Sequence, residues 1–237
     1  MSKNKQMLSE TITTVGRERS TTGPASLAQG VYGARGNLEL VTCDARDGLW
    51  VFWFNSDLAT DPLETPEVPP GTWSAGLAFA RGAGYRQAQI LQSTLGPDHL
   101  EVLALRADGV LESWYWSPGP GFQCRAGHVA DGVERFEAVH AAGRLTATMD
   151  GEEGVRVIAS GSEGYPDRVW TAADNGPDLD AGTQAATLLV ANGVSEGDIV
   201  PGSARASRSD RAGGTIELTW RDRQGALRHL GVGAPVH

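Results

Sequence analysis

The sequence predicts an all-β protein built as a β-propeller, and three observations support this architecture. The 237 residues include 31 glycines and 12 prolines, a composition typical of chains with many tight turns and few long helices. A pattern of strand, turn and strand recurs along the chain. Each such hairpin is too small to be stable alone in water, so the copies must pack against one another.

The first strand of the repeated pattern is a short alternating run. It occurs at Leu38 to Val41, Leu100 to Leu103, Val155 to Ile158 and Ile216 to Thr219, at spacings of 62, 55 and 61 positions. Alternation with a period of two places successive side chains on opposite faces of a strand. A glycine follows nine or ten residues after each start, in the pairs Asp47-Gly48, Asp108-Gly109, Glu163-Gly164 and Gln224-Gly225. Each copy is therefore expected to be an antiparallel hairpin closed by this turn.

Further strands are expected before the hairpins, at 28–33 and 89–96, which gives sheets of three or four strands. We expect a single domain over 1–237, with repeat units near 24–83, 84–132, 133–182 and 183–237 and an N-terminal closing strand or arm within 1–23. Four blades are predicted. A fifth, eroded blade is an alternative, because four units of about 60 residues exceed the length of an ordinary blade. Its strands could come from "SETITTVGRERST" (9–21) or from "TLLVANGVSEGDIVPG" (187–202). The segment "ETITTVG" (10–16) is the candidate strand for closing the ring, and the Pro-rich insertion 58–73 is expected to be an exposed loop.

The first two copies resemble the repeat of bacterial propeller lectins of the fucose-binding, Photorhabdus-lectin-like kind. The matching residues of the first copy are Gln29, Gly33, Gly36 to Val41, Asp47 to Leu49, Trp53, Asn55, Asp57 and Trp73. Those of the second copy are Gln92, Gly96, Leu100 to Val102, Asp108, Gly109, Leu111 and Trp114 to Trp116. The resemblance covers residues 24–122. It implies a propeller fold and carbohydrate binding, without a metal, in clefts between neighbouring blades.

Aromatic side chains are the main candidates for a binding site, because an indole offers an apolar face to a sugar ring and an N–H to a hydroxyl. Packing between blades is the competing role for each of them. Asn55 and Asp57 could bind sugar hydroxyls or cap their own turn. The predicted ligand-binding set is Trp50, Trp53, Asn55, Asp57, Trp73, Trp114, Tyr115 and Trp116.

Three glutamates, Glu39, Glu101 and Glu217, recur at one position of the repeated strand. If that position faced a central channel, the carboxyl groups would converge and could act as acid and base in a lyase, isomerase or cyclase. The alternative is a solvent-facing position on an alternating strand. A third hypothesis is a protein-interaction scaffold that uses the loops, including 58–73.

Several classes of function are disfavoured by the sequence. The formal net charge of −9 argues against a nucleic-acid partner, and neither a signal peptide nor a transmembrane segment is visible, so a cytoplasmic location away from membranes is expected. The histidines and cysteines lack zinc-site spacing, and nucleophile-elbow and phosphate-loop motifs are absent. We therefore expect no metal, no cofactor and a carbohydrate or other small-molecule ligand. A homo-oligomer would multiply weak sites.

Overall fold

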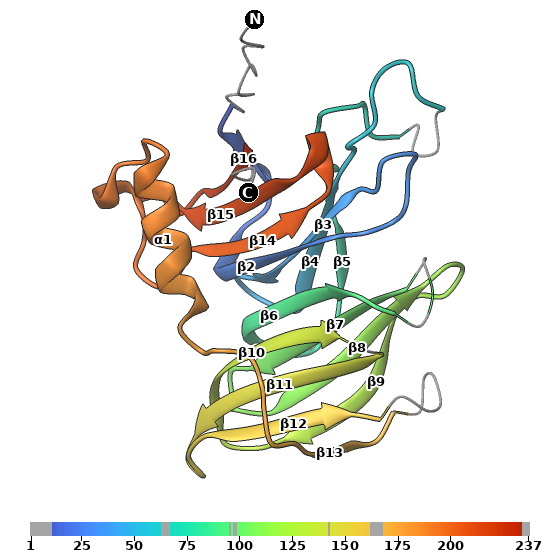
Figure 1. Cartoon of the computed structure of the whole chain (residues 1–237). Helices are drawn as coiled ribbons and strands as arrows, with labels where there is room; N and C mark the ends of the chain where they lie inside the picture. Colours follow the sequence, from blue (N-terminus) through green and yellow to red (C-terminus); the bar gives the residue numbers. More distant parts are fainter. Residues whose placement is uncertain are drawn as a thin grey trace, which may run out of the picture.

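The computed structural model describes residues 11–62, 67–94, 96, 99–141, 143–161 and 168–233. Its strands form four antiparallel sheets of four strands each, which follow one another around the molecule as four blades (Figure 1). Blade 1 consists of β2 (Thr21–Gln29), β3 (Leu38–Asp44), β4 (Leu49–Phe54) and β5 (Leu77–Phe79). Blade 2 consists of β6 (Tyr85–Gln92), β7 (Leu100–Arg106), β8 (Leu111–Ser117) and β9 (Gly121–Ala130).

Blade 3 consists of β10 (Val133–Ala141), β11 (Arg144–Gly151), β12 (Arg156–Ser160) and β13 (Trp170–Ala172). Blade 4 consists of β14 (Arg205–Ser209), β15 (Thr215–Arg221), β16 (Leu227–Gly233) and β1 (Thr13–Thr14). The predicted four-bladed β-propeller is thus confirmed. The N-terminal strand closes the ring as predicted, because Thr13 and Thr14 pair with His229 and Arg228 at the outer edge of blade 4.

The second and third strands of every blade are joined by a turn that contains a glycine with positive φ. The four residues are Gly48, Gly109, Gly154 and Gly225, with φ angles of 84°, 88°, 76° and 79°. Glycine adopts this backbone region without the steric cost that a Cβ would impose. Three of these turns are the ones predicted from the sequence.

The third repeat was predicted in the wrong register. Its second strand is β11, and the predicted run, apart from Val155, lies in the third strand, β12. The small and polar residues of "RLTATMDG" hide the alternation of Leu145, Ala147 and Met149, although all three side chains are buried. The turn of this blade therefore contains Gly154, and the predicted turn at Glu163-Gly164 lies outside the described residues.

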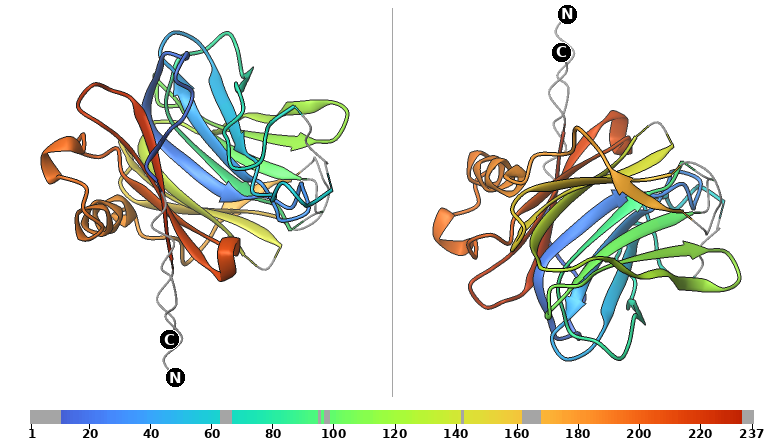
Figure 2. Two further views of the ribbon diagram at one scale, coloured as in Figure 1. Left: turned by 90° about the horizontal axis from the view of Figure 1, so that it is seen from above. Right: turned by 90° about the horizontal axis from the view of Figure 1, so that it is seen from below.

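One of the two segments proposed as the source of a fifth blade is helical instead. Helix α1 (Ala181–Ala191) is followed by the 3-10 helix η1 (Glu196–Asp198), and α1 lies at the edge of the molecule beside blade 4 (Figure 2). Ala185 and Leu189 share one helical face and pack into the blade 4 core. The apolar run that resembled a strand therefore belongs to a helix, and Leu189 is its buried residue. Among the described residues no helix is long and apolar enough to cross a membrane.

The first strands of the four blades, β2, β6, β10 and β14, surround a polar central channel of about 480 Å³. Glutamine side chains connect neighbouring blades there. Gln87 Nε2 donates to Phe136 O (2.6 Å), and Gln87 Oε1 accepts from Phe136 N–H (3.3 Å). Gln89 makes the same pair of bonds to Ala138, each 2.8 Å long. These amides satisfy backbone groups on the edge of β10, which would otherwise lack partners.

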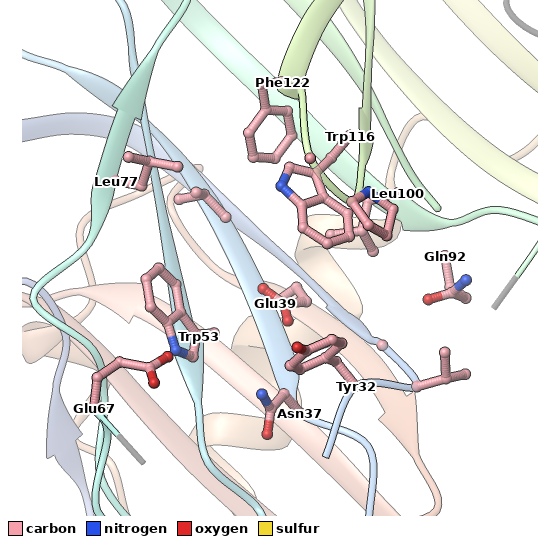
Figure 3. A pocket seen from close by; sticks show the side chains of 15 residues that line it. Tyr32, Asn37, Glu39, Trp53, Glu67, Leu77, Gln92, Leu100, Trp116 and Phe122 are labelled. Carbon is pink, nitrogen blue, oxygen red and sulfur yellow. The ribbon is translucent and has the colours of Figure 1, made fainter. Parts of the chain in front are cut away.

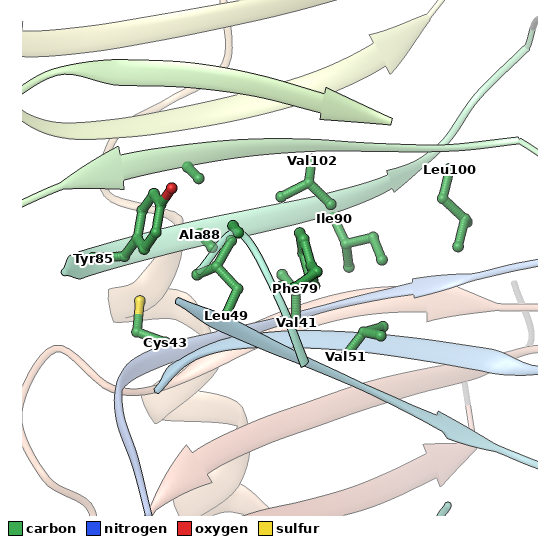
Figure 4. Packing of buried hydrophobic residues seen from close by; sticks show 12 residues of the cluster. Val41, Cys43, Leu49, Val51, Phe79, Tyr85, Ala88, Ile90, Leu100 and Val102 are labelled. Atoms are coloured by element: carbon green, nitrogen blue, oxygen red, sulfur yellow. The ribbon is translucent and has the colours of Figure 1, made fainter. Parts of the chain in front are cut away.

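Blades 1 and 2 are held together by an apolar cluster in which their facing side chains interdigitate. Val41, Leu49 and Phe79 from blade 1 meet Ile90 and Val102 from blade 2 (Figure 4). All five side chains are buried. This cluster fixes the distance between the two blades, and the candidate site lies beside it.

Candidate functional site

An open cleft of about 400 Å³ lies between blades 1 and 2, and we call it the blade 1–2 cleft. Its walls combine aromatic, apolar and carboxyl side chains from both blades (Figure 3). The residues that define it are Tyr32, Glu39, Trp53, Leu100, Trp116 and Phe122. The volume is within the range that proteins use for small-molecule ligands.

Strand register explains why these side chains meet. Glu39 on β3 lies directly opposite Trp53 on β4, so both point to the same face of blade 1. On blade 2, Leu100 lies opposite Trp116, and Trp116 lies opposite Phe122. These two rows face each other across the cleft. Tyr32 comes from the loop between β2 and β3 and is 45% exposed at the rim.

Glu39 is the one strongly perturbed group in this cleft. Its residue is only 9% exposed, and its carboxyl group lies among Trp53, Trp116 and Tyr32 (Figure 3). Among the described residues, no charged or hydrogen-bonding partner offsets the burial of this carboxyl group. Burial therefore raises the pKa of Glu39 to about 8.

The two equivalent glutamates have charged partners. Glu101 accepts from Arg125 (Nη1 to Oε1, 2.6 Å), and its Oε2 lies 2.6 Å from His140 Nε2 and 3.3 Å from Arg168 Nη1. Burial acts to raise the pKa of Glu101, but the His140 hydrogen bond and the two arginines hold that pKa below its ordinary value. This side chain is fully buried between blades 2 and 3, where Arg125, His140 and Arg168 surround its carboxylate.

Glu217 is paired in a similar way between blades 4 and 1. It accepts from Ser209 (2.6 Å) and from Arg211 Nε (2.9 Å), and His229 Nε2 lies 2.8 Å from its other oxygen. Burial opposes ionisation, but the hydrogen bonds from His229 and Arg211 lower the pKa of Glu217 to about 2. None of the three glutamates lines the central channel. The expectation that they converge there is wrong, because the alternation of the second strands turns these side chains toward neighbouring blades.

Of the predicted binding residues, the fold brings Trp53 and Trp116 together in the blade 1–2 cleft. Trp50 instead donates to Asp44 Oδ2 (2.7 Å) on another face of blade 1, with Arg19 above its ring at 4.5 Å. Trp114 donates to Glu112 Oε2 (3.0 Å) and packs its ring edge-on against Phe79, inside the cluster that joins the two blades. Trp50 and Trp53 are separated because they lie on opposite faces of β4, whereas Trp114 and Trp116 share a face of β8 and differ in their position along the strand.

The remaining predicted residues have structural partners. Asn55 and Asp57 are buried: Asn55 Nδ2 donates to Val68 O (2.8 Å), and Asp57 Oδ1 accepts from the Arg35 N–H (2.9 Å). Trp73 donates to Thr13 Oγ1 (3.1 Å) of the closing strand.

Tyr115 lies opposite Glu101 in blade 2, and the Arg125 guanidinium lies 5.4 Å from the centre of its ring. Its ring therefore belongs to the filled cleft between blades 2 and 3.

Most residues of the cleft were not in the predicted ligand-binding set, among them Tyr32, Phe122 and Glu67. Tyr32 lies in a loop that was predicted to be part of a strand. Phe122 is the second residue of β9 and lies opposite Trp116. Glu67 comes from the 58–73 insertion and reaches the rim of the cleft. The signal that could have identified Phe122 is its position across a short turn from Trp114 to Trp116. In the described ranges no three His, Cys, Asp or Glu side chains are grouped to hold a metal ion.

No protein-family model and no curated protein matches the chain. Solved structures that are similar to it include SapL1 lectin in complex with alpha-methyl fucoside, with a TM-score of 0.46 and 13% sequence identity over 91% of this chain. BP39L lectin from Burkholderia pseudomallei is similar with a TM-score of 0.44 and 14% identity over 91% of this chain. Aleuria aurantia lectin, in complex with alpha-methyl-L-fucoside, gives a TM-score of 0.44 and 12% identity over 90% of this chain. The chain spans 61%, 53% and 58% of the lengths of these three proteins.

Proposed function

We propose that this propeller is a carbohydrate-binding protein that holds a sugar ring in the blade 1–2 cleft. The observation that carries the proposal is the pairing of two indoles from adjacent blades, Trp53 and Trp116, around one buried carboxyl group, Glu39. Indole faces pack against the C–H side of a pyranose, and a carboxyl group binds hydroxyls. The wall of apolar side chains completes a site that suits an amphipathic ligand.

The stoichiometry follows from the comparison between blades. The clefts occupied by Glu101 and Glu217 are filled by ion pairs, whereas the cleft at Glu39 is open. Among these three glutamate-containing clefts we therefore propose one sugar per chain, in the blade 1–2 cleft. A single shallow site of this size binds weakly, and high avidity would need several chains acting together.

Titration calorimetry and tryptophan fluorescence with a panel of methyl glycosides test the proposal. The panel includes neutral, acidic and amino sugars as well as alpha-methyl fucoside. Trp53→Ala and Trp116→Ala should each weaken binding about tenfold, because a buried indole face is worth on the order of 1.5 kcal/mol. Trp50→Ala is the matched control, since Trp50 lies on another face of blade 1 and should leave the affinity unchanged. Absence of binding across the panel would refute the proposal.

A further inference from the structure

In two other clefts of this propeller, an arginine lies close to both a buried glutamate and an aromatic ring. In blade 2, Arg125 donates to Glu101 (2.6 Å) and also lies 5.4 Å from the ring centre of Tyr115, the residue opposite that glutamate. One guanidinium therefore satisfies a carboxylate and an aromatic face together. Both contacts favour a cation at that position.

The cleft between blades 4 and 1 also holds an arginine beside its glutamate, but the residue opposite Glu217 is Gly231, and the nearby ring is Phe54 of blade 1. Arg211, in the 3-10 helix η2 (Arg211–Gly213), donates to Glu217 (2.9 Å) and lies 5.2 Å from the ring centre of Phe54. The arginine thus comes from β9 in one case and from η2 in the other. What the two clefts share is the cation itself, placed between a carboxylate and a ring.

Blade 1 has the carboxyl group and the ring but no cation. Glu39 lies opposite Trp53 as Glu101 lies opposite Tyr115. Among the described residues that line the blade 1–2 cleft there is no lysine, arginine or histidine, and the charged groups are Glu39 and Glu67. The other titratable group is the Tyr32 phenol, and the cleft residues that face Glu39 from β4 and from blade 2 are uncharged. An acidic cleft with aromatic walls is complementary to a positive charge.

We propose that the blade 1–2 cleft binds a sugar bearing an ammonium group, with the ammonium between the Glu39 carboxylate and the Trp53 ring, where the other two clefts hold arginine. This inference rests on the proposed function, since it specifies the class of sugar that the same site takes. The ligand thus supplies a positive charge, which no described residue that lines this cleft provides. Trp116 and Tyr32 then cover the ring of the sugar.

Binding of an ammonium must be coupled to the ionisation of Glu39. In the empty cleft burial raises the pKa of Glu39 to about 8, so the carboxyl group is mostly protonated at pH 7. An ammonium beside it favours the carboxylate, and the proton is released to solvent. A neutral sugar has no such effect, because its hydroxyls bind either form.

The test uses three methyl glycosides that share one ring, namely methyl glucosaminide, methyl N-acetylglucosaminide and methyl glucoside. Calorimetry with the full chain at pH 7 should show the amine binding about tenfold tighter than the other two, as expected for a charge-assisted hydrogen bond. Titrations in two buffers of different ionisation enthalpy should show proton release with the amine and none with methyl glucoside. Because proton release is measured on the wild-type chain, this result does not depend on whether a variant folds.

In the Glu39→Gln variant, methyl glucosaminide and methyl glucoside should bind with about equal affinity. Glu134→Gln, an exposed change on blade 3, should keep the preference for the amine. Methyl glucoside binding as tightly as the amine would overturn this inference while leaving the proposed function intact. Failure of all three glycosides would overturn this inference, and only failure of the whole glycoside panel would overturn the proposed function as well. Choline and 3,3-dimethylbutan-1-ol have the same shape and differ in charge alone, so they test whether the cleft binds an ammonium group that is not part of a sugar. Binding of choline without binding of any glycoside would overturn the proposal in favour of such an ammonium compound.

Discussion

Replacing Glu39 with glutamine should make the protein more stable at alkaline pH. The pKa of this carboxyl group rises from 4.5 in the unfolded chain to about 8 in the fold, so the native state holds a proton that the unfolded state has lost between these values. Where the native state binds more protons, the free energy of unfolding decreases as the pH increases. The wild type therefore loses stability between pH 4.5 and 8 through this residue.

The size of the effect follows from the same shift. One pKa unit corresponds to about 1.36 kcal/mol, so the wild type pays up to about 5 kcal/mol at pH 9 for ionising Glu39 inside the cleft. Glutamine matches the protonated side chain in shape and never ionises. The variant should equal the wild type within about 1 kcal/mol at pH 5, and the difference should grow in favour of the variant toward pH 9.

Urea unfolding of the two proteins at pH 5, 7 and 9 measures this difference, because the free energy of unfolding extrapolates linearly with urea. Glu134→Gln, an exposed substitution, controls for the loss of one negative charge. Parallel pH profiles for wild type and Glu39→Gln would refute the reasoning, since they would show that Glu39 ionises normally in the fold.

Three further changes should destabilise the protein. Glu217→Gln should cost about 3–5 kcal/mol at pH 7, because a partly buried arginine and a buried histidine lose their carboxylate. Since folding lowers the pKa of Glu217 to about 2, its contribution should be lost as the pH falls from 4.5 toward 2. Gln87→Leu should cost about 2–4 kcal/mol, because the backbone N–H and C=O of Phe136 both lose a partner. Gly48→Ala should cost about 1–3 kcal/mol, because the position has a φ of 84° and a Cβ there would lie 2.6 Å from Phe79 O. Urea unfolding measures all three.

Controls for these variants are available on exposed positions. Glu134→Gln and Gln123→Leu change the same residue types outside the buried networks, and Gly119→Ala adds a methyl group at a positive φ in open space. Each control should cost less than its partner. A Gln87→Leu variant as stable as Gln123→Leu would show that water replaces the glutamine bridge between blades 2 and 3.

The sequence was informative where strand alternation and turn chemistry are both strong. Blades 1 and 2 have long apolar residues in their second strands and an Asp-Gly turn, so their hairpins were predicted in register. In blade 3 threonine and alanine take those positions, and the register was lost. Helix α1 was missed because its buried stripe contains few large residues, and its run "TLLVA" is equally compatible with a strand.

The site was only partly predictable for a different reason. Local alternation showed that Trp114 and Trp116 share a face, but the pairing of Trp53 with Trp116 depends on which faces of blades 1 and 2 meet. The lack of a cationic partner for the Glu39 carboxyl group among the described residues is a tertiary property as well. It became visible only when the partners of Glu101 and Glu217 were known.

A crystal of this chain soaked with the methyl glycoside that binds most tightly in solution tests the central claim most directly. We predict one ligand per chain in the blade 1–2 cleft, with its ring between Trp53 and Trp116 and a polar group at Glu39. Ligand density confined to the central channel, or to the surface beside Trp50, would contradict this assignment.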